Sequence, residues 1–255
     1  ITRLPYPFDY EEQYSGVMDK NGNIMMSPEY SNISNIGDSG YYVACEAETG
    51  MYGIIDENYE WICESEYSGI YKVWNGSTDN LVKVNEEYLL IAVYDFQEGH
   101  GAEIINEYGG TIVPMEYYDI NAQCGMNRLI VENSEGYYGA IDLNGNLEIA
   151  CQYDELGDFS YDEETYAMKD GAVFAVDIYG NERFLTNADD CWQIDSNLYE
   201  VGINENWSVI DSNGEYLFSE TYDNHEVNEK YIAGSNEENK NGILMLKSGE
   251  VVSTE

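Results

Sequence analysis

Gly139-Ala-Ile-Asp-Leu-Asn-Gly-Asn-Leu147 is the stretch of sequence that decides the fold of this chain. It joins a small residue, two apolar residues and an Asp to a turn and a second apolar position. The Asn-Gly pair supplies the positive φ that a tight hairpin turn needs, and the apolar residues beside it favour strands. The stretch therefore predicts a β-hairpin.

The same phrase recurs through the whole sequence. Its other copies are Gly16-Val-Met-Asp-Lys-Asn-Gly-Asn-Ile24, Gly53-Ile-Ile-Asp-Glu-Asn-Tyr-Glu-Trp61, Glu103-Ile-Ile-Asn-Glu-Tyr-Gly-Gly-Thr111, Phe174-Ala-Val-Asp-Ile-Tyr-Gly-Asn-Glu182, Ser208-Val-Ile-Asp-Ser-Asn-Gly-Glu-Tyr216 and the degenerate Ile243-Leu-Met-Leu-Lys-Ser-Gly-Glu-Val251. The turn position falls at Gly22, Tyr59, Gly109, Gly145, Gly180, Gly214 and Gly249, at intervals of 37, 50, 36, 35, 34 and 35 residues. This period predicts a repeat protein of about seven hairpin-based units. The longest interval places added residues between Trp74 and His100.

Each unit continues beyond its hairpin. A Tyr and an apolar residue follow most copies, as Tyr153 and Leu156 follow the copy at 139–147, and a further strand is predicted next, for example over 165–168 or 81–84. We therefore expect about three short strands in each unit, and no segment has sustained helical periodicity. Such units cannot bury both faces alone, so neighbours must stack. The prediction is an all-β repeat protein that forms a single domain over residues 1–255.

The two ends of the sequence bear on how the units stack. Tyr6, Phe8 and Tyr10 alternate with other residues as a half-buried strand would. If this strand completed the last unit, the ring would close and protect its sheet edges. We therefore favour a propeller-like toroid, with an open β-solenoid or spiral as the alternative.

The phrase reads aromatic-Gly-apolar-apolar-Asp in its best copies, Tyr52-Gly53-Ile-Ile-Asp56 and Tyr138-Gly139-Ala-Ile-Asp142. In this it resembles the bacterial WG-repeat family, also called KWG repeats, across nearly all of the chain, although Tyr replaces Trp and no Trp-Gly dipeptide occurs. The resemblance implies a non-catalytic β-repeat module of secreted or surface-associated bacterial proteins, and it carries no catalytic residues. The expected location is therefore extracellular or at a bacterial cell surface. A chain that begins at Ile1 would fit either a removed signal peptide or a domain cut from a longer protein.

The charge balance limits the partners. Fifty acidic residues against ten Lys and Arg give a formal net charge of −40, which repels nucleic acid and anionic lipid surfaces. No apolar run is long enough to cross a membrane as a helix. The charge is explained by solubility, by a basic partner or by bound cations, and weak non-specific cation binding is expected.

Several common catalytic motifs do not occur in the sequence. His100 and His225 form no zinc motif, and neither a Gly-x-Ser-x-Gly elbow nor a phosphate-binding glycine loop occurs, so we predict no cofactor. The Asp of each phrase is expected to bond its own turn, because the spacing does not match a calcium loop. The five cysteines, Cys45, Cys63, Cys124, Cys151 and Cys191, are expected as small buried apolar residues, with one or two disulfides as the alternative.

Exposed aromatic residues are the best candidates for contact with a ligand. We single out Trp74, Tyr94, Phe96 and His100, which fall in the added residues, and Trp192, whereas Trp61 and Trp207 fall at repeat positions and are expected in the core. The sequence thus predicts a non-enzymatic binding or scaffold module that contacts a protein or a glycan through its loops. The alternatives are a glycan hydrolase that uses two carboxylates and a structural spacer of a larger surface protein.

Overall fold

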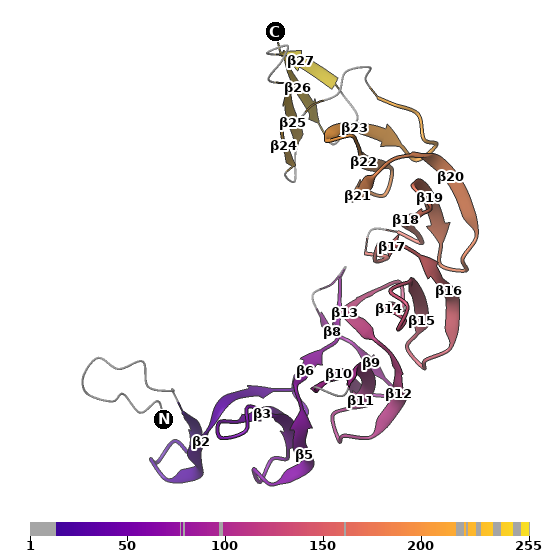
Figure 1. Ribbon diagram of the computed structural model, residues 1–255. Coiled ribbons are helices and arrows are strands. Elements are labelled where there is room, and N and C mark those ends of the chain that lie inside the picture. The colour runs from indigo at the N-terminus through magenta and orange to yellow at the C-terminus, as the bar shows by residue number, and fades with distance from the viewer. Residues whose placement is uncertain are drawn as a thin grey trace. The chain divides into compact units, whose positions relative to one another are not determined.

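The computed structural model describes residues 14–76, 78, 80–96, 99–160, 162–217 and 222, together with the strands at 224–227, 231–236, 241–246 and 251–254. For Phe96 and those last four strands only the backbone is described. The described residues form strands joined by turns, so the predicted all-β fold is confirmed (Figure 1). They include no helix long and apolar enough to span a membrane.

The strands form six sheets. The first sheet has the order β1 (Ser15–Met18), β2 (Ile24–Asn35), β3 (Tyr42–Glu46), β4 (Tyr52–Ile55), β5 (Trp61–Tyr67). The second has the order β12 (Thr111–Tyr117), β11 (Gly99–Asn106), β10 (Glu87–Phe96), β6 (Gly69–Lys72), and β9 (Lys83–Val84) also pairs with β10. The third has the order β16 (Leu147–Tyr153), β15 (Tyr138–Asp142), β14 (Arg128–Glu132), β13 (Asp119–Gly125), β7 (Trp74–Asn75), β8 (Asn80–Leu81).

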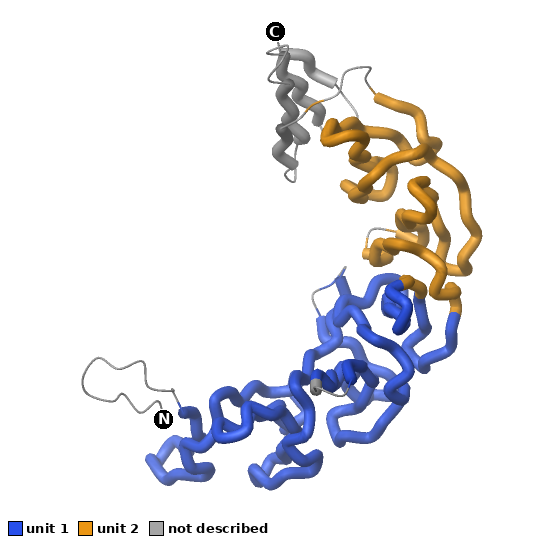
Figure 2. The backbone as a smooth tube through the Cα atoms, viewed as in Figure 1, with its two compact units in different colours: residues 1–136, 140–147 blue, residues 137–139, 148–255 orange. Residues whose placement is uncertain are grey.

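The last three sheets follow the chain strictly. They are β17 (Glu155–Leu156), β18 (Glu164–Lys169), β19 (Ala172–Asp177), β20 (Glu182–Asn187); then β21 (Asp190–Asp195), β22 (Leu198–Ile203), β23 (Asn206–Asp211); then β24 (Asn224–Val227), β25 (Tyr231–Asn236), β26 (Asn241–Leu246), β27 (Val251–Thr254). The chain divides into two compact units, 1–136 with 140–147 and 137–139 with 148–255 (Figure 2). The single domain over 1–255 stays a prediction.

The predicted hairpins are confirmed. The phrase copies form the neighbouring strand pairs β1–β2, β4–β5, β11–β12, β15–β16, β19–β20 and β26–β27. In the sixth copy the pairing is reduced to one bridge, between Ile210 and Tyr216. The strand expected over Tyr6–Tyr10 lies outside the described residues, so the closed ring stays a prediction.

Some repeat units contain more strands than the sequence predicts. The prediction of three short strands per unit is wrong for the sheet of β17 to β20, because Leu156, expected only as an apolar anchor, lies in the additional strand β17. Strand β2 pairs with two other strands over different parts of its length. Its first part pairs with β1, as Val17 with Met26, and its last part pairs with β3, as Ile33 with Ala44.

The added residues build two features in the first compact unit. The strand expected over 81–84 is divided between β8 and β9, and β10 instead pairs along β11, from Leu89 opposite Asn106 to Phe96 opposite Gly99. The short hairpin β7–β8 joins the third sheet through a parallel pairing of Trp74 with Gln123 and Asn75 with Cys124. The insertion thus adds a hairpin at the edge of the third sheet.

The core lies between successive sheets, because the two apolar residues of each phrase point to opposite faces. Ile54 belongs to a buried cluster with Val43, Tyr67 and Leu90, whereas Ile55 belongs to a second cluster with Met26 and Ala44. Strand β4 therefore contributes one side chain to each of two clusters. All five cysteines have free thiols, and Cys45, Cys124 and Cys191 are buried among apolar residues, as predicted.

The phrase Asp holds its own turn, also as predicted. Asp142 Oδ1 accepts hydrogen bonds from the backbone N–H of Asn144 and Asn146, and Asn146 Nδ2 donates to Asp142 Oδ2. Although partial burial alone would raise the pKa of Asp142, these hydrogen bonds hold that pKa below its ordinary value. The same bonding recurs at Asp19, Asp56, Asp177 and Asp211, with the pKa lowered at each.

We expect Asp142→Asn to weaken the fold at neutral pH by a small amount that disappears in acid. The folded-state pKa lies below the unfolded value, so the stabilisation is complete above about pH 4 and is lost as the pH falls through the folded pKa. An amide keeps the acceptor, since Asn106 accepts from Tyr108 N–H and Gly110 N–H in the third copy. Urea unfolding of the unsubstituted chain and of Asp142→Asn at neutral and acidic pH measures the difference between their free energies of unfolding. A difference that does not change with pH contradicts this account.

Candidate functional site

The two tryptophans predicted as ligand contacts are exposed. Trp74 in β7 exposes 46% of its surface and Trp192 in β21 exposes 60%. Trp61 and Trp207, expected in the core, are half-buried at its margin, and the Trp61 ring lies 5.8 Å from the Tyr30 ring. A contact role for Trp74 and Trp192 stays a prediction.

Tyr94 and His100 lie near the closed end of the β10–β11 hairpin. Tyr94 is half-buried, and its hydroxyl donates to Glu103 Oε1 at 3.1 Å, beside Tyr67, whose hydroxyl donates to the same oxygen at 3.0 Å. The His100 ring lies 4.5 Å from the Tyr118 ring, and His100 Nδ1 is 3.5 Å from Asp95 Oδ1. Phe96 ends β10 opposite Gly99, and its side chain lies outside the described residues.

The candidates of the first compact unit do not form one site. Val73 N–H donates to Leu89 O, so Trp74 follows one end of β10, whereas Tyr94 lies toward the other end. About five residues of extended strand, roughly 17 Å, separate those positions. Trp192 belongs to the second compact unit. Within the first compact unit, the structure places Tyr94, the backbone of Phe96 and His100 at the same end of the β10–β11 pair.

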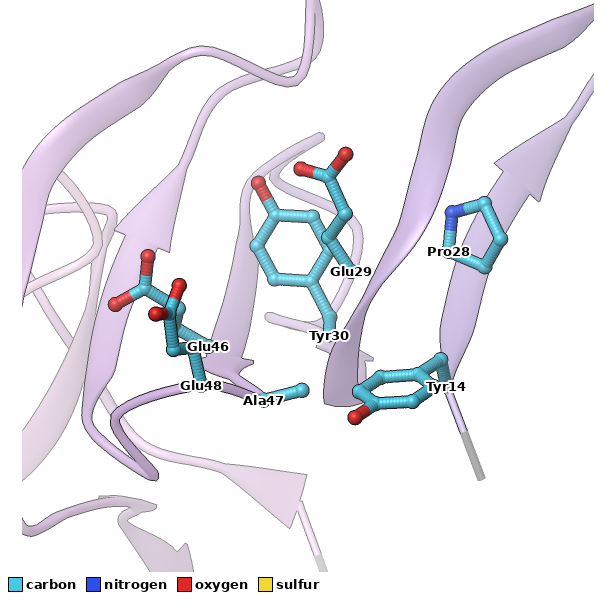
Figure 3. Close-up of a pocket in the computed structure, with 7 residues that line it drawn as sticks. All are labelled: Tyr14, Pro28, Glu29, Tyr30, Glu46, Ala47 and Glu48. Carbon is cyan, nitrogen blue, oxygen red and sulfur yellow. The ribbon is translucent and has the colours of Figure 1, made fainter. Parts of the chain in front are cut away.

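A pocket that sequence reasoning missed lies in the first sheet. It encloses about 580 Å³ between the start of β1, the middle of β2 and the end of β3 (Figure 3). Its lining residues are Tyr14, Pro28, Glu29, Tyr30, Glu46, Ala47 and Glu48. The register explains their proximity, because Tyr30 pairs with Ser15 on one side and with Glu46 on the other. Figure 3 shows Tyr30 between the carboxylates of Glu46 and Glu48 and the ring of Tyr14.

The pocket is acidic and partly preformed. Glu46 Oε2 accepts hydrogen bonds from Thr49 Oγ1 at 2.7 Å and from Ser65 Oγ at 3.2 Å, which fix its carboxylate. Burial, and then the charges of Glu29 and Glu46, raise the pKa of Tyr30, so its hydroxyl stays protonated. None of the ion pairs found among the described residues involves Glu29, Glu46 or Glu48. Three carboxylates and the rings of Tyr14 and Tyr30 thus line this pocket.

This arrangement suits a cationic group. Carboxylates attract an ammonium or guanidinium group, and a tyrosine face adds a cation–π contact of about 0.5–1 kcal/mol at an exposed site. The carboxyl groups with raised pKa values are elsewhere. Burial raises the pKa of Glu107 and of Glu155, and neither residue lines the pocket.

The sequence held only a weak signal for this pocket. Tyr30 follows the first hairpin as Tyr153 follows the hairpin at 139–147, and Glu46-Ala-Glu48 puts two acids close together. With 50 acidic residues in the chain, such a pair does not stand out. The pocket forms only when Tyr14 and Glu46, which are far apart in the sequence, meet on either side of β2.

Two segments of the chain, 16–47 and 138–169, match the family model of the WG containing repeat. The first begins at Gly16 and the second at Tyr138, one residue before Gly139, and each runs through the hairpin, its Tyr and the next strand. The predicted resemblance is therefore confirmed at these two segments. A search of the curated proteins finds no match.

The chain is also similar to solved structures. Apo AztD from Citrobacter koseri has 9% identity and a TM-score of 0.44, covering 88% of this chain and 70% of that chain. Hsv2 from Kluyveromyces lactis has 8% identity and a TM-score of 0.40, covering 90% and 87%. The WD40 β-propeller domain of Doa1 has 11% identity and a TM-score of 0.39, covering 87% and 81%. These similarities identify neither a ligand nor an activity for this chain.

Proposed function

We propose that this chain, in which two segments match the WG containing repeat, is a non-enzymatic binding module that holds a basic segment of a partner protein. The observation that carries the proposal is the acidic pocket walled by Tyr14 and Tyr30. A net charge of −40 supports it further, because a long-range negative field accelerates association with a cationic partner.

The pocket favours a protein partner over a neutral glycan. Glu29, Glu46 and Glu48 present three negative charges, which a lysine or arginine side chain neutralises and a neutral sugar does not. Tyr30 packs against the core, so its exposed edge is held in place before a ligand arrives. Glycan hydrolysis and a purely structural spacer remain the rival proposals, and the rivals predict no pocket-dependent peptide binding.

We expect an oligolysine peptide to bind the full chain, and Glu29→Gln with Glu48→Gln to weaken that binding about fivefold to tenfold. Each lost exposed charge pair accounts for about 0.2–1 kcal/mol. Tyr14→Ala adds a loss of about threefold, through the cation–π contact. Isothermal titration calorimetry at physiological salt measures both effects.

The control is a double substitution with the same change in net charge. Glu116→Gln with Glu135→Gln removes two exposed carboxylates that lie outside the pocket. A peptide with acetylated lysines tests the need for the ligand charge. Equal weakening by the two double variants would show that only the general surface charge attracts the peptide, and it would refute the pocket proposal.

A further inference from the structure

The start of the added residues places a lysine and a tryptophan on one face of the first compact unit. Lys72 ends β6 and Trp74 begins β7, and Val73 between them has 0% of its surface exposed. Because alternate residues of an extended chain point to the same side, Lys72 and Trp74 share a face, with their Cα atoms about 7 Å apart. Trp74 is 46% exposed and Lys72 is half-buried. The chain thus presents a cation and an exposed indole ring together.

Lys72 has no acidic partner among the described residues. None of the ion pairs found there involves it, although the chain has 50 acidic residues. Burial alone lowers the pKa of Lys72, whereas a nearby carboxylate would raise that pKa. An anion bound beside Lys72 would offset the unfavourable burial of its charge.

A second lysine on the same face is compensated within the chain. Lys83 pairs opposite Tyr88 of β10. Lys72 pairs opposite Leu90, two residues further along that strand, so both lysines lie on one face of the sheet. Lys83 Nζ lies 3.4 Å from Asp38 Oδ1 and 4.1 Å from the centre of the Tyr88 ring. Lys83 is therefore already paired, and Lys72 is the cation that a ligand can use.

We propose that Lys72 and Trp74 bind a hexuronic acid unit of an acidic glycan. The C–H face of a sugar ring stacks on an exposed indole ring, and the carboxylate of the same sugar accepts charge-assisted hydrogen bonds from the lysine ammonium group. A neutral sugar would leave Lys72 without a counter-charge, and a peptide of glutamates offers no ring to Trp74.

The negative charge of the whole chain does not prevent this contact. A net charge of −40 repels an anionic ligand at long range. At about 0.15 M salt, interactions between exposed charges are largely screened beyond about 8 Å. The groups that touch the ligand therefore determine its affinity more than the distant carboxylates do.

An NMR titration of the full chain with tetragalacturonate at about 0.15 M salt tests the proposal. We expect the indole N–H signal of Trp74 to shift with a dissociation constant of about 1 mM. Lys72→Gln is expected to weaken binding about threefold to fivefold, and Trp74→Ala about fivefold or more. The backbone amide signals of β6 and β7 report binding in Trp74→Ala.

The controls change the same chemistry elsewhere. Lys20→Gln removes one positive charge from an exposed lysine, and Trp192→Ala removes a tryptophan that is 60% exposed in the second compact unit. Neither is expected to change the affinity. Methyl-esterified tetragalacturonate keeps the sugar rings without their charges, and it is expected to bind the unsubstituted chain as weakly as tetragalacturonate binds Lys72→Gln.

Three outcomes would overturn this proposal. The first is a Trp74 signal that does not move at about 20 mM tetragalacturonate, about twenty times the expected dissociation constant. The second is equal affinity for the acid and its methyl ester. The third is equal affinity for tetraglutamate, which would indicate a general anion contact. Circular dichroism checks that the variants fold. Oligolysine binding in the acidic pocket is a separate measurement, so either proposal can fail without the other.

Discussion

Gly139→Ala is expected to lower the free energy of unfolding by about 3 kcal/mol or more, because the added methyl group overlaps backbone atoms. A Cβ at this position would lie 2.5 Å from Ile149 O, 2.8 Å from Cys151 N and 2.9 Å from Ala150 C. All three atoms belong to the backbone of β16, so no side-chain rotation relieves the overlap. The strand pair β15–β16 would have to separate.

The same close approach explains the small residue at the start of the phrase. A Cβ on Gly53 would lie 2.5 Å from Cys63 O, and one on Gly16 would lie 2.5 Å from Met26 O. Phe174 occupies this position in the fifth copy, where it pairs with Phe184 of β20. Gly16 and Gly53 instead fall within register shifts of their strand pairs, where the partner backbone closes on them.

Urea unfolding measures the effect, and Gly99→Ala is its control. A Cβ on Gly99 would meet nothing within 4 Å, so that substitution is expected to change stability by less than about 0.5 kcal/mol. Equal unfolding midpoints for the Gly139 and Gly99 variants would mean that the β16 backbone does not close on Gly139.

Tyr166→Phe is expected to cost about 2 kcal/mol at neutral pH, and less in acid. The buried Tyr166 hydroxyl donates a hydrogen bond to Glu155 Oε1. Burial raises the pKa of Glu155, and this hydrogen bond lowers it again by stabilising the carboxylate. A hydrogen bond to a charged group is worth about 1.5–3 kcal/mol, and its loss leaves a partly buried charge without this donor.

The pH dependence follows from the sign of that shift. Without the Tyr166 hydroxyl, the folded-state pKa of Glu155 rises further above its unfolded value. The stability lost in Tyr166→Phe is therefore greatest above the raised pKa of Glu155. The loss shrinks as the pH falls through that pKa, because the carboxyl group becomes protonated and its burial no longer desolvates a charge. Unfolding at about pH 7 and about pH 5 measures the change.

A double-mutant cycle with Glu155→Leu separates this bond from the general loss of a hydroxyl. If the pair is coupled, the double variant loses less stability than the sum of the two single variants. Additive losses would contradict a direct interaction between Tyr166 and Glu155.

Local features of the chain were predictable because their causes are local. Asn144-Gly145 fixes a hairpin turn through the positive φ of +87° at Gly145, and Asp142 bonds the backbone two and four residues ahead. These interactions lie within one phrase, so the sequence pattern reports them directly. The seven-copy period extends the same argument along the chain.

Other features depend on contacts between distant residues, and sequence patterns do not report those. Strand β17 has two residues, too few for any period to be visible. The acidic pocket needs Tyr14, Tyr30 and Glu46 to meet across three strands. The sequence analysis selected Trp74 and Trp192 as exposed aromatic residues, and both are exposed. Exposure alone does not create a concave binding site.

The pairing of Trp74 with Gln123 has a consequence for how the chain folds. Repeat arrays usually have low contact order, because each unit touches its sequence neighbours and can form as soon as they are in place. Here β7 pairs with β13, and Gln123 lies 49 residues after Trp74 in the chain. The entropy of closing that loop must be overcome before the pairing contributes. The added hairpin is therefore expected to be among the last elements of the first compact unit to form during folding.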